Sequence, residues 1–124
     1  MLNHLLLYLG ALLTFIWGAA HLVPTRSVVR AFGEISADNK RIITMEWIIE
    51  GVTLIFIAIL VSGTTYLGHA TTLGYFNLLS AVILLFTLAV ISLFTGFRVN
   101  FLPYRLCPVI FSISALCIIA GIYL

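Results

Sequence analysis

Residues 72–94 read TLGYFNLLSAVILLFTLAVISLF and contain no aspartate, glutamate, lysine or arginine. At about 1.5 Å of rise per residue, a helix of this length spans the roughly 30 Å hydrocarbon core of a lipid bilayer. The run is apolar throughout and shows none of the alternation expected for a strand of a membrane β-barrel. We therefore predict a transmembrane helix over these residues.

The rest of the chain contains three more runs of this kind. We predict spans at residues 5–23, 42–61, 72–94 and 106–124. Pro24 follows the first span, Ser62-Gly63 ends the second, and Pro108 falls in the first turn of the fourth, where its missing N–H costs little. Because only helices or closed barrels satisfy every backbone group in lipid, we expect an all-α integral membrane protein. Its single domain, residues 1–124, is a bundle of four transmembrane helices.

The composition excludes a water-soluble globule. Of the 124 residues, 63% are hydrophobic and only 8% are charged, against roughly 25% charged in ordinary soluble domains. The net charge of +2 is small, and the chain has no basic run with interleaved aromatic residues. We therefore expect the lipid bilayer as the surrounding partner and no nucleic acid.

The charged residues orient the chain. With four crossings, all six cations lie on one side: Arg26, Arg30, Lys40, Arg41, Arg98 and Arg105. Loops that remain in the cytoplasm carry an excess of lysine and arginine. We predict that loops 24–41 and 95–105 are cytoplasmic and that both termini lie outside, with the protein in the plasma membrane of a bacterium or an archaeon.

The first of these loops is long enough for structure of its own. Apolar residues recur there at roughly helical spacing: Val28, Val29, Phe32 and Ile35. With Thr25 as its N-cap, this pattern predicts a short interfacial helix, the alternative being an irregular solvated loop. Asp38 is the expected N-cap of the second span.

Two carboxylates enter the apolar region. Glu46 and Glu50 are four residues apart in the second span, so they share a helix face that Thr53 continues. An ionised side chain inside the bilayer costs on the order of 3 kcal/mol and normally faces a bundle interior or a cavity. Two stacked carboxylates also repel each other. We expect at least one of them to be protonated, bridged by a cation or bound to a ligand.

Polar side chains of the first span lie at the same depth as the two glutamates. His21 closes the first span on the cytoplasmic side, and Trp17 shares its helix face. Together with Glu46, Glu50 and Thr53, these residues form the predicted ligand-binding or proton-binding set. In the alternative interpretation the glutamates only lock the helices together, through ion pairs with arginines in the adjoining loops. Those arginines are Arg26, Arg98 and Arg105.

No established catalytic or metal-binding motif is present. His4 and His69 fall on the outer side, where they could approach each other, but two histidines are weak evidence for a metal. Cys107 and Cys117 are ten residues apart on one helix, too far for a disulfide, so we expect reduced, buried thiols. We predict no catalytic residues and no metal site.

One stretch resembles a known family. Residues 45–54, MEWIIEGVTL, resemble the acidic, glycine-containing and leucine-rich run that opens the second helix of DoxX-like membrane proteins. Residues 18–24, GAAHLVP, are similar to the end of the first helix in that family. The resemblance implies a four-helix architecture and an accessory role beside a quinone-linked oxidoreductase. Glu46, Glu50 and His21 are the residues that it carries over.

Three functions fit these features. The first is a ligand-binding or accessory subunit that holds a quinone-like or lipid-like molecule in a polar pocket of the cytoplasmic half. The second is a homo-oligomeric, proton-coupled transporter of small molecules that uses Glu46 and Glu50. The third is a structural partner in a larger membrane complex. The sequence defines no enzymatic activity.

Overall fold

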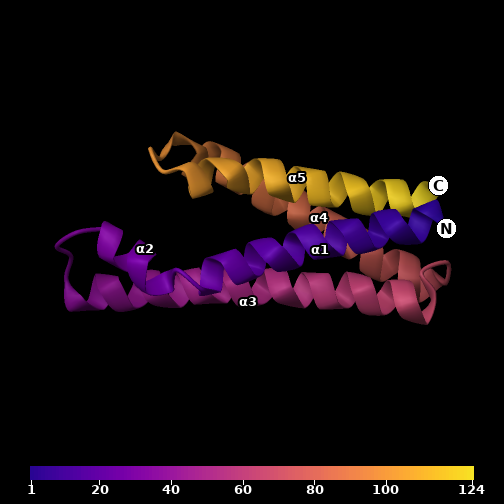
Figure 1. The fold of residues 1–124 in the computed structure, drawn as a ribbon, viewed down its shortest axis with the longest axis horizontal. Coiled ribbons are helices and arrows are strands. Elements are labelled where there is room, and N and C mark those ends of the chain that lie inside the picture. Colours follow the sequence, from indigo (N-terminus) through magenta and orange to yellow (C-terminus); the bar gives the residue numbers. More distant parts are fainter.

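The computed structural model describes all 124 residues, and every element in it is helical (Figure 1). Its elements are α1 (Leu2–Leu22), α2 (Thr25–Ala31), α3 (Ala37–Gly68), α4 (Thr72–Phe94), the short 3-10 helix η1 (Gly96–Arg98) and α5 (Leu102–Tyr123). The four long helices α1, α3, α4 and α5 are long and apolar enough to cross a membrane. The predicted bundle of four membrane helices is therefore confirmed.

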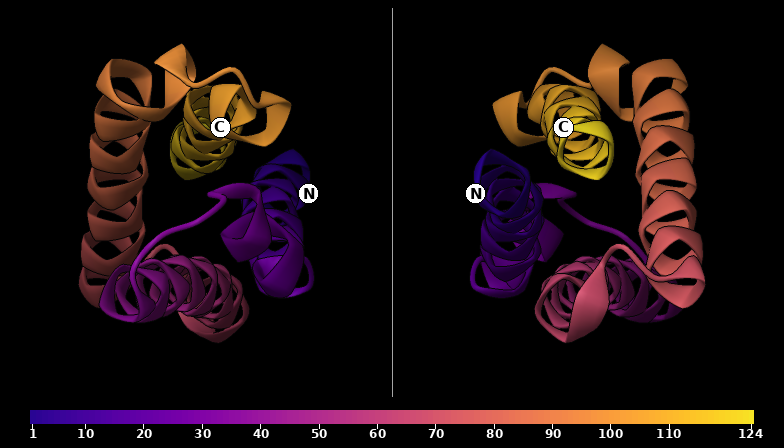
Figure 2. Two further views of the ribbon diagram at one scale, coloured as in Figure 1. Left: turned by 90° about the vertical axis from the view of Figure 1, so that its left-hand side faces the viewer. Right: turned by 90° about the vertical axis from the view of Figure 1, so that its right-hand side faces the viewer.

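The four long helices form a ring. Viewed along the bundle, α1 lies between α3 and α5, and α4 closes the ring (Figure 2). The contacts around the ring are uneven: α1 packs closely on α3 and α5, and α5 on α4, whereas α3 and α4 touch much less. The core consists of fully buried apolar side chains, among them Leu7, Leu54, Leu85 and Phe111. The α3–α4 side is the open side of the bundle.

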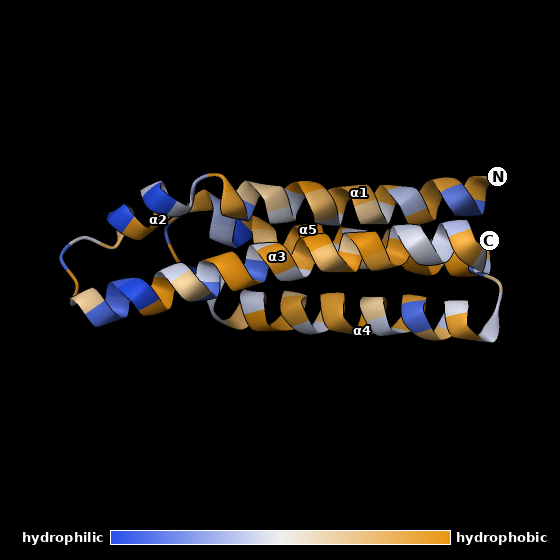
Figure 3. Cartoon of the chain, turned by 90° about the horizontal axis from the view of Figure 1, so that it is seen from below, coloured by the Kyte–Doolittle hydropathy of each residue, from blue (hydrophilic) through white to orange (hydrophobic).

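The two ends of the bundle differ in polarity. Both termini lie at one end, and α2 lies at the other together with the start of α3 (Figure 1). Hydrophilic residues concentrate on α2 and on the first turns of α3 (Figure 3). We call this end, which also carries η1 and the start of α5, the charged end.

Helix α3 extends beyond the predicted span. The predicted end at Ser62-Gly63 is wrong, because the helix continues to Gly68, whose φ of +136° is accessible to glycine. A glycine inside a helix costs only about 1 kcal/mol. Tertiary packing overcomes that cost: Thr64 and Thr65 are buried, and the Thr65 hydroxyl donates to the Val61 carbonyl at 2.7 Å.

Helix α5 begins earlier than predicted. It starts at Leu102, so Pro103 occupies the first turn and Pro108 lies inside the helix, contrary to the prediction. A proline at an interior position has no N–H for the carbonyl of the residue four before it, here Tyr104. The Cys107 thiol donates to the Pro103 carbonyl at 3.5 Å in these first turns, and Cys107 and Pro108 are both buried in the bundle.

The first loop contains the predicted short helix, α2, with Val28 and Val29 buried. Both predicted caps are wrong. Pro24 precedes α2, and the Thr25 hydroxyl instead donates back to the carbonyls of His21 and Leu22 at the end of α1. Ser36 caps α3 in place of Asp38, because its hydroxyl accepts from the Asn39 N–H at 3.2 Å.

Helices α1 and α3 are in close backbone contact at two glycines. A Cβ added to Gly18 would lie 2.9 Å from the Gly51 carbonyl oxygen, and one added to Gly51 would lie 3.0 Å from the Gly18 carbonyl oxygen. Small residues at helix crossings allow such backbone contact. His21 lies one turn beyond Gly18, and Glu50 directly precedes Gly51. This crossing therefore brings His21 and Glu50 together.

Candidate functional site

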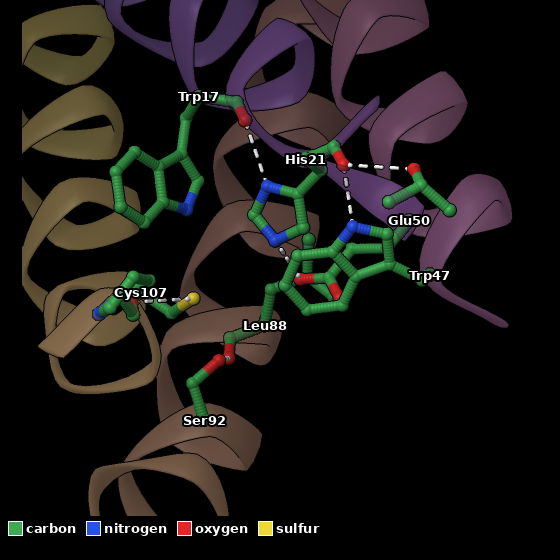
Figure 4. Close-up of polar contacts among 9 residues, drawn as sticks. Trp17, His21, Trp47, Glu50, Leu88, Ser92 and Cys107 are labelled. Carbon is green, nitrogen blue, oxygen red and sulfur yellow. Dashed lines mark hydrogen bonds and ion pairs between the residues drawn. The ribbon is translucent and has the colours of Figure 1, made fainter. Parts of the chain in front are cut away.

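His21 lies at the centre of the site. Its side chain, near the carboxyl end of α1, is only 3% exposed. The imidazole stacks on the Trp47 ring of α3 at a centroid distance of 4.6 Å, and the Trp17 ring meets it edge-on at 5.7 Å (Figure 4). The two indoles hold the imidazole in one orientation.

A hydrogen bond sets the tautomer of His21. Its Nδ1 lies 2.8 Å from the Trp17 carbonyl oxygen one turn earlier. Because a carbonyl only accepts, Nδ1 must carry the hydrogen and donate it. In the neutral ring, Nε2 then presents its lone pair on the opposite side. That side faces α3 and α5.

Two further ligand-type atoms converge on Nε2. The Oε1 atom of Glu50 lies 3.4 Å from His21 Nε2. The Cys107 sulfur of α5 completes a group in which the three candidate ligand atoms all lie within 4.8 Å of one another. Nε2 itself is buried and forms no hydrogen bond. We call these three residues the His21–Glu50–Cys107 cluster.

Hydrogen bonds fix the end of α1 beside this cluster. The Trp47 indole N–H donates to the His21 carbonyl oxygen at 2.5 Å, which links α3 to α1. The Thr25 hydroxyl reaches the same oxygen at 3.2 Å. Since the last carbonyls of a helix have no partner within the helix, these donors stabilise its end. The cluster therefore sits on a firmly held backbone.

A cleft adjoins the cluster on the open side of the bundle. It has a volume of about 710 Å³ and is lined by 16 residues, ten of them hydrophobic. Glu46, Glu50 and Thr53 all line it, as their predicted common face requires. Polar groups also come from α4 and α5: Ser92, Thr95, Tyr104 and Cys107. We call this the α3–α4 cleft. Two other surface clefts, of about 410 and 680 Å³, contain no carboxylate.

The two predicted glutamates occupy different environments. Glu50 is partly exposed, at 36%, and contacts His21. Glu46 lies one turn nearer the charged end, is exposed, and lines the cleft without contacting His21. Trp17 packs on His21 instead of lining the cleft, and its indole N–H is buried without a partner.

The predicted ion pairs with arginine are absent. Neither glutamate pairs with Arg26, Arg98 or Arg105, and the other ion pair in the structure is a surface contact between Arg41 and Asp38. Arg105 donates instead to the Val99 carbonyl at 3.3 Å. All three arginine side chains are exposed at the charged end, where water or headgroups solvate them, whereas Glu50 turns toward the bundle. The structure therefore contains none of the ion pairs that this alternative interpretation requires.

Cys107 is the member of the site that sequence reasoning missed. Its spacing from Cys117 indicated only an ordinary buried thiol, and that thiol is indeed buried. A usable signal was its position: His21, Glu50 and Cys107 each lie near the charged end of a different membrane helix. Tyr104, one turn earlier on α5, packs edge-on against Trp47 at a centroid distance of 5.6 Å.

No family model, curated protein or solved structure matches this chain. The resemblance to DoxX-like proteins therefore stays a prediction. The interpretation of the site depends on its own geometry.

The opposite end of the bundle has a smaller polar group. The rings of His4 and His69 meet edge-on at a centroid distance of 4.7 Å, so these residues do approach each other. The Asn3 amide nitrogen lies 3.2 Å from His69 Nε2. The Asn3 amide is therefore a hydrogen-bond partner of that ring nitrogen.

Proposed function

We propose that this protein binds an apolar molecule with a hydrogen-bonding end, quinone-like or lipid-like, in the α3–α4 cleft. The cleft itself carries the proposal. Its volume of about 710 Å³ lies inside the range of about 300–1,000 Å³ that is usual for small-molecule sites. Its lining is mostly apolar with a few polar groups, as such sites require.

The polar groups suit one end of such a molecule. Glu50 and Glu46 come from α3, Ser92 from α4 and Tyr104 from α5, so donors and acceptors reach the cleft from three helices. A carbonyl head placed among them accepts from the Tyr104 hydroxyl, and a hydroxyl head can also donate to the Glu50 carboxylate. The hydrophobic side chains of the cleft then contact the apolar body.

Tryptophan fluorescence tests this assignment. The chain contains two tryptophans, of which Trp47 lines the cleft and Trp17 does not. A short-chain benzoquinone titrated into the Trp17→Phe variant in detergent should quench Trp47 saturably. The Trp47→Phe variant, which keeps Trp17, should show only weak collisional quenching. Equal, non-saturating quenching in both variants contradicts binding in the cleft.

A blocking substitution gives a second test. Ile91→Trp places a large ring in the cleft lining and should weaken benzoquinone affinity at least about 10-fold, because the apolar body loses its space. Ile83→Trp is the matched control, since Ile83 is also exposed on α4 but lies outside the cleft. The affinity for benzoquinone is measured in a competition-binding assay, and helix content by circular dichroism checks that each variant folds. Equal affinity in both variants counts against the cleft.

We also propose the orientation that the cation distribution predicts: termini outside and the charged end in the cytoplasm of a bacterium or an archaeon. Single reporters test it, with Ala37→Cys or Ala70→Cys placed in a Cys107→Ser/Cys117→Ser background. Both alanines are exposed, at opposite ends of α3. A membrane-impermeant maleimide should label residue 70 in intact cells and residue 37 only after lysis. The reverse pattern refutes the orientation.

Two other functions stay predictions. Proton-coupled transport by a homo-oligomer requires Glu46 or Glu50 to exchange protons, and a structural role in a larger complex requires a docking surface. A lipid-reconstituted monomer that binds quinone but moves no proton separates the proposed function from transport. Normal abundance in cells without any co-purifying protein separates it from the structural role.

A further inference from the structure

We propose that the His21–Glu50–Cys107 cluster binds a divalent transition-metal ion of borderline softness, with Zn²⁺ as the ion of choice. The three residues supply one nitrogen, one oxygen and one sulfur ligand from three different helices. Imidazole, carboxylate and thiolate are the ligand types that Zn²⁺ uses in proteins. This site goes beyond the proposed function, because metal binding needs only these three side chains.

The spacing of the ligand atoms suits a small ion. In a tetrahedral site with metal–ligand bonds of about 2.0–2.3 Å, neighbouring ligand atoms lie about 3.3–3.8 Å apart. The His21 Nε2 to Glu50 Oε1 distance of 3.4 Å already matches this value. The Cys107 sulfur, which donates to the Pro103 carbonyl at 3.5 Å, lies within 4.8 Å of the other two atoms, so it has to move toward them to complete such a site.

His21 is held as metal-binding histidines are held. Such histidines donate their second ring N–H to a carbonyl or carboxylate, which fixes the ring and directs the free nitrogen at the metal. His21 makes this bond through Nδ1 to the Trp17 carbonyl at 2.8 Å. Its Nε2 is left buried, without a hydrogen bond, and facing Glu50 and Cys107 (Figure 4).

Charge balance favours the same ligand. With His21 neutral, a carboxylate and a thiolate offset the two positive charges of Zn²⁺, so the assembled site carries no net charge. A neutral assembly avoids the cost of an isolated charge in an apolar surrounding. In the metal-free protein the 3.4 Å contact between Nε2 and Glu50 is an ion pair, in which a proton on Nε2 occupies the position that the metal ion would take.

The fourth coordination position opens toward the α3–α4 cleft. Of the three ligands, Glu50 is the most exposed, and both Glu50 and Cys107 line that cleft. Zinc sites with three protein ligands keep their fourth position for water or another small ligand. The proposed metal therefore faces the same space as the ligand of the proposed function.

Cobalt spectroscopy tests the site. The purified protein in detergent is first treated with a chelator, which is then removed, and titrated with Co²⁺. We expect one ion per chain, a sulfur-to-cobalt charge-transfer band in the near ultraviolet, and loss of that band when Zn²⁺ displaces the cobalt. A folded protein that binds no Co²⁺, or binds it without the sulfur band, overturns the proposal.

Matched variants assign the ligands. Cys107→Ser should abolish the charge-transfer band and weaken Zn²⁺ binding at least about 100-fold, whereas Cys117→Ser, on the same helix, should leave both unchanged. Glu50→Gln should weaken binding, and Glu34→Gln in the first loop should not. A band that persists in Cys107→Ser, or disappears in Cys117→Ser, refutes the assignment.

A measurement on the unaltered chain avoids variants that fail to fold. Bound Zn²⁺ should slow alkylation of Cys107 by a membrane-permeant maleimide and leave Cys117 unaffected, as quantified by peptide mass spectrometry. Equal rates for Cys107 with and without Zn²⁺ contradict the site. Quinone quenching of Trp47 is measured on protein from which metal has been removed with a chelator. A failure of the metal proposal can therefore be distinguished from a failure of the proposed quinone binding in the cleft.

Discussion

Valine in place of Gly18 should lower the free energy of unfolding by about 3 kcal/mol. The added side chain has no room, because even its Cβ would lie 2.9 Å from the Gly51 carbonyl oxygen and 2.9 Å from the Ile55 side chain. Backbone cannot move aside as a flexible side chain can, so α1 and α3 must separate. Unfolding by sodium dodecyl sulfate in mixed micelles, followed by circular dichroism, measures the change.

The same substitution should also disrupt the site. Because His21 and Glu50 flank the Gly18–Gly51 crossing, separating the helices moves His21 Nε2 away from the carboxylate. Gly63→Ala is the matched control, since a Cβ there meets no atom within 4 Å. Alanine in that helix interior should stabilise the protein by about 0.5–1 kcal/mol. Wild-type stability in Gly18→Val would contradict the crossing.

In metal-free protein, leucine in place of His21 should lower the free energy of unfolding by about 3 kcal/mol. The substitution removes the only ion-pair partner of Glu50 and leaves that carboxylate at membrane depth. It also removes the ring stacked on Trp47. The backbone carbonyls that accept from Trp47 and Thr25 remain, so the loss reports on the side chain.

The double variant decides whether the effect comes from the pair. Replacing both partners of a buried pair by apolar residues is often neutral, because no uncompensated charge remains. His21→Leu combined with Glu50→Leu should therefore recover most of the stability that His21→Leu loses. If the stability losses of the single variants His21→Leu and Glu50→Leu simply add in the double variant, the two side chains are not coupled. The cycle is measured with the same unfolding assay.

The fold class follows from composition and from the length of the apolar runs. Lipid leaves few alternatives for a backbone, so residues 72–94 could be assigned to a helix without knowledge of any contact. Helix ends were harder to predict, because packing decides them. Gly63 stays helical because the residues that follow it are buried in the bundle. Pro108 lies inside α5 because the helix already begins at Leu102.

The site was predictable only where residues share one helix. Glu46, Glu50 and Thr53 line one cleft because their spacing is helical. The meeting of His21 with Glu50 also followed from equal depth in the bundle. Depth alone places Cys107 near the charged end, but its membership of the cluster also depends on how α5 packs beside α1, which no local pattern encodes. The ion pairs with the arginines could not be judged from the sequence either, because a similar depth in the bundle does not determine the direction in which a long side chain points.

The edges of the α3–α4 cleft have a practical consequence. Ile42 and Ile49 of α3 and Ile91 of α4 line the cleft and are also exposed on the outer surface of the bundle. A molecule dissolved among acyl chains can therefore enter sideways from the surrounding phase, without passing through water. Its effective concentration is then its mole fraction in the bilayer or micelle. Occupancy should follow the ratio of ligand to detergent, so that diluting a sample with detergent empties the cleft at constant total ligand.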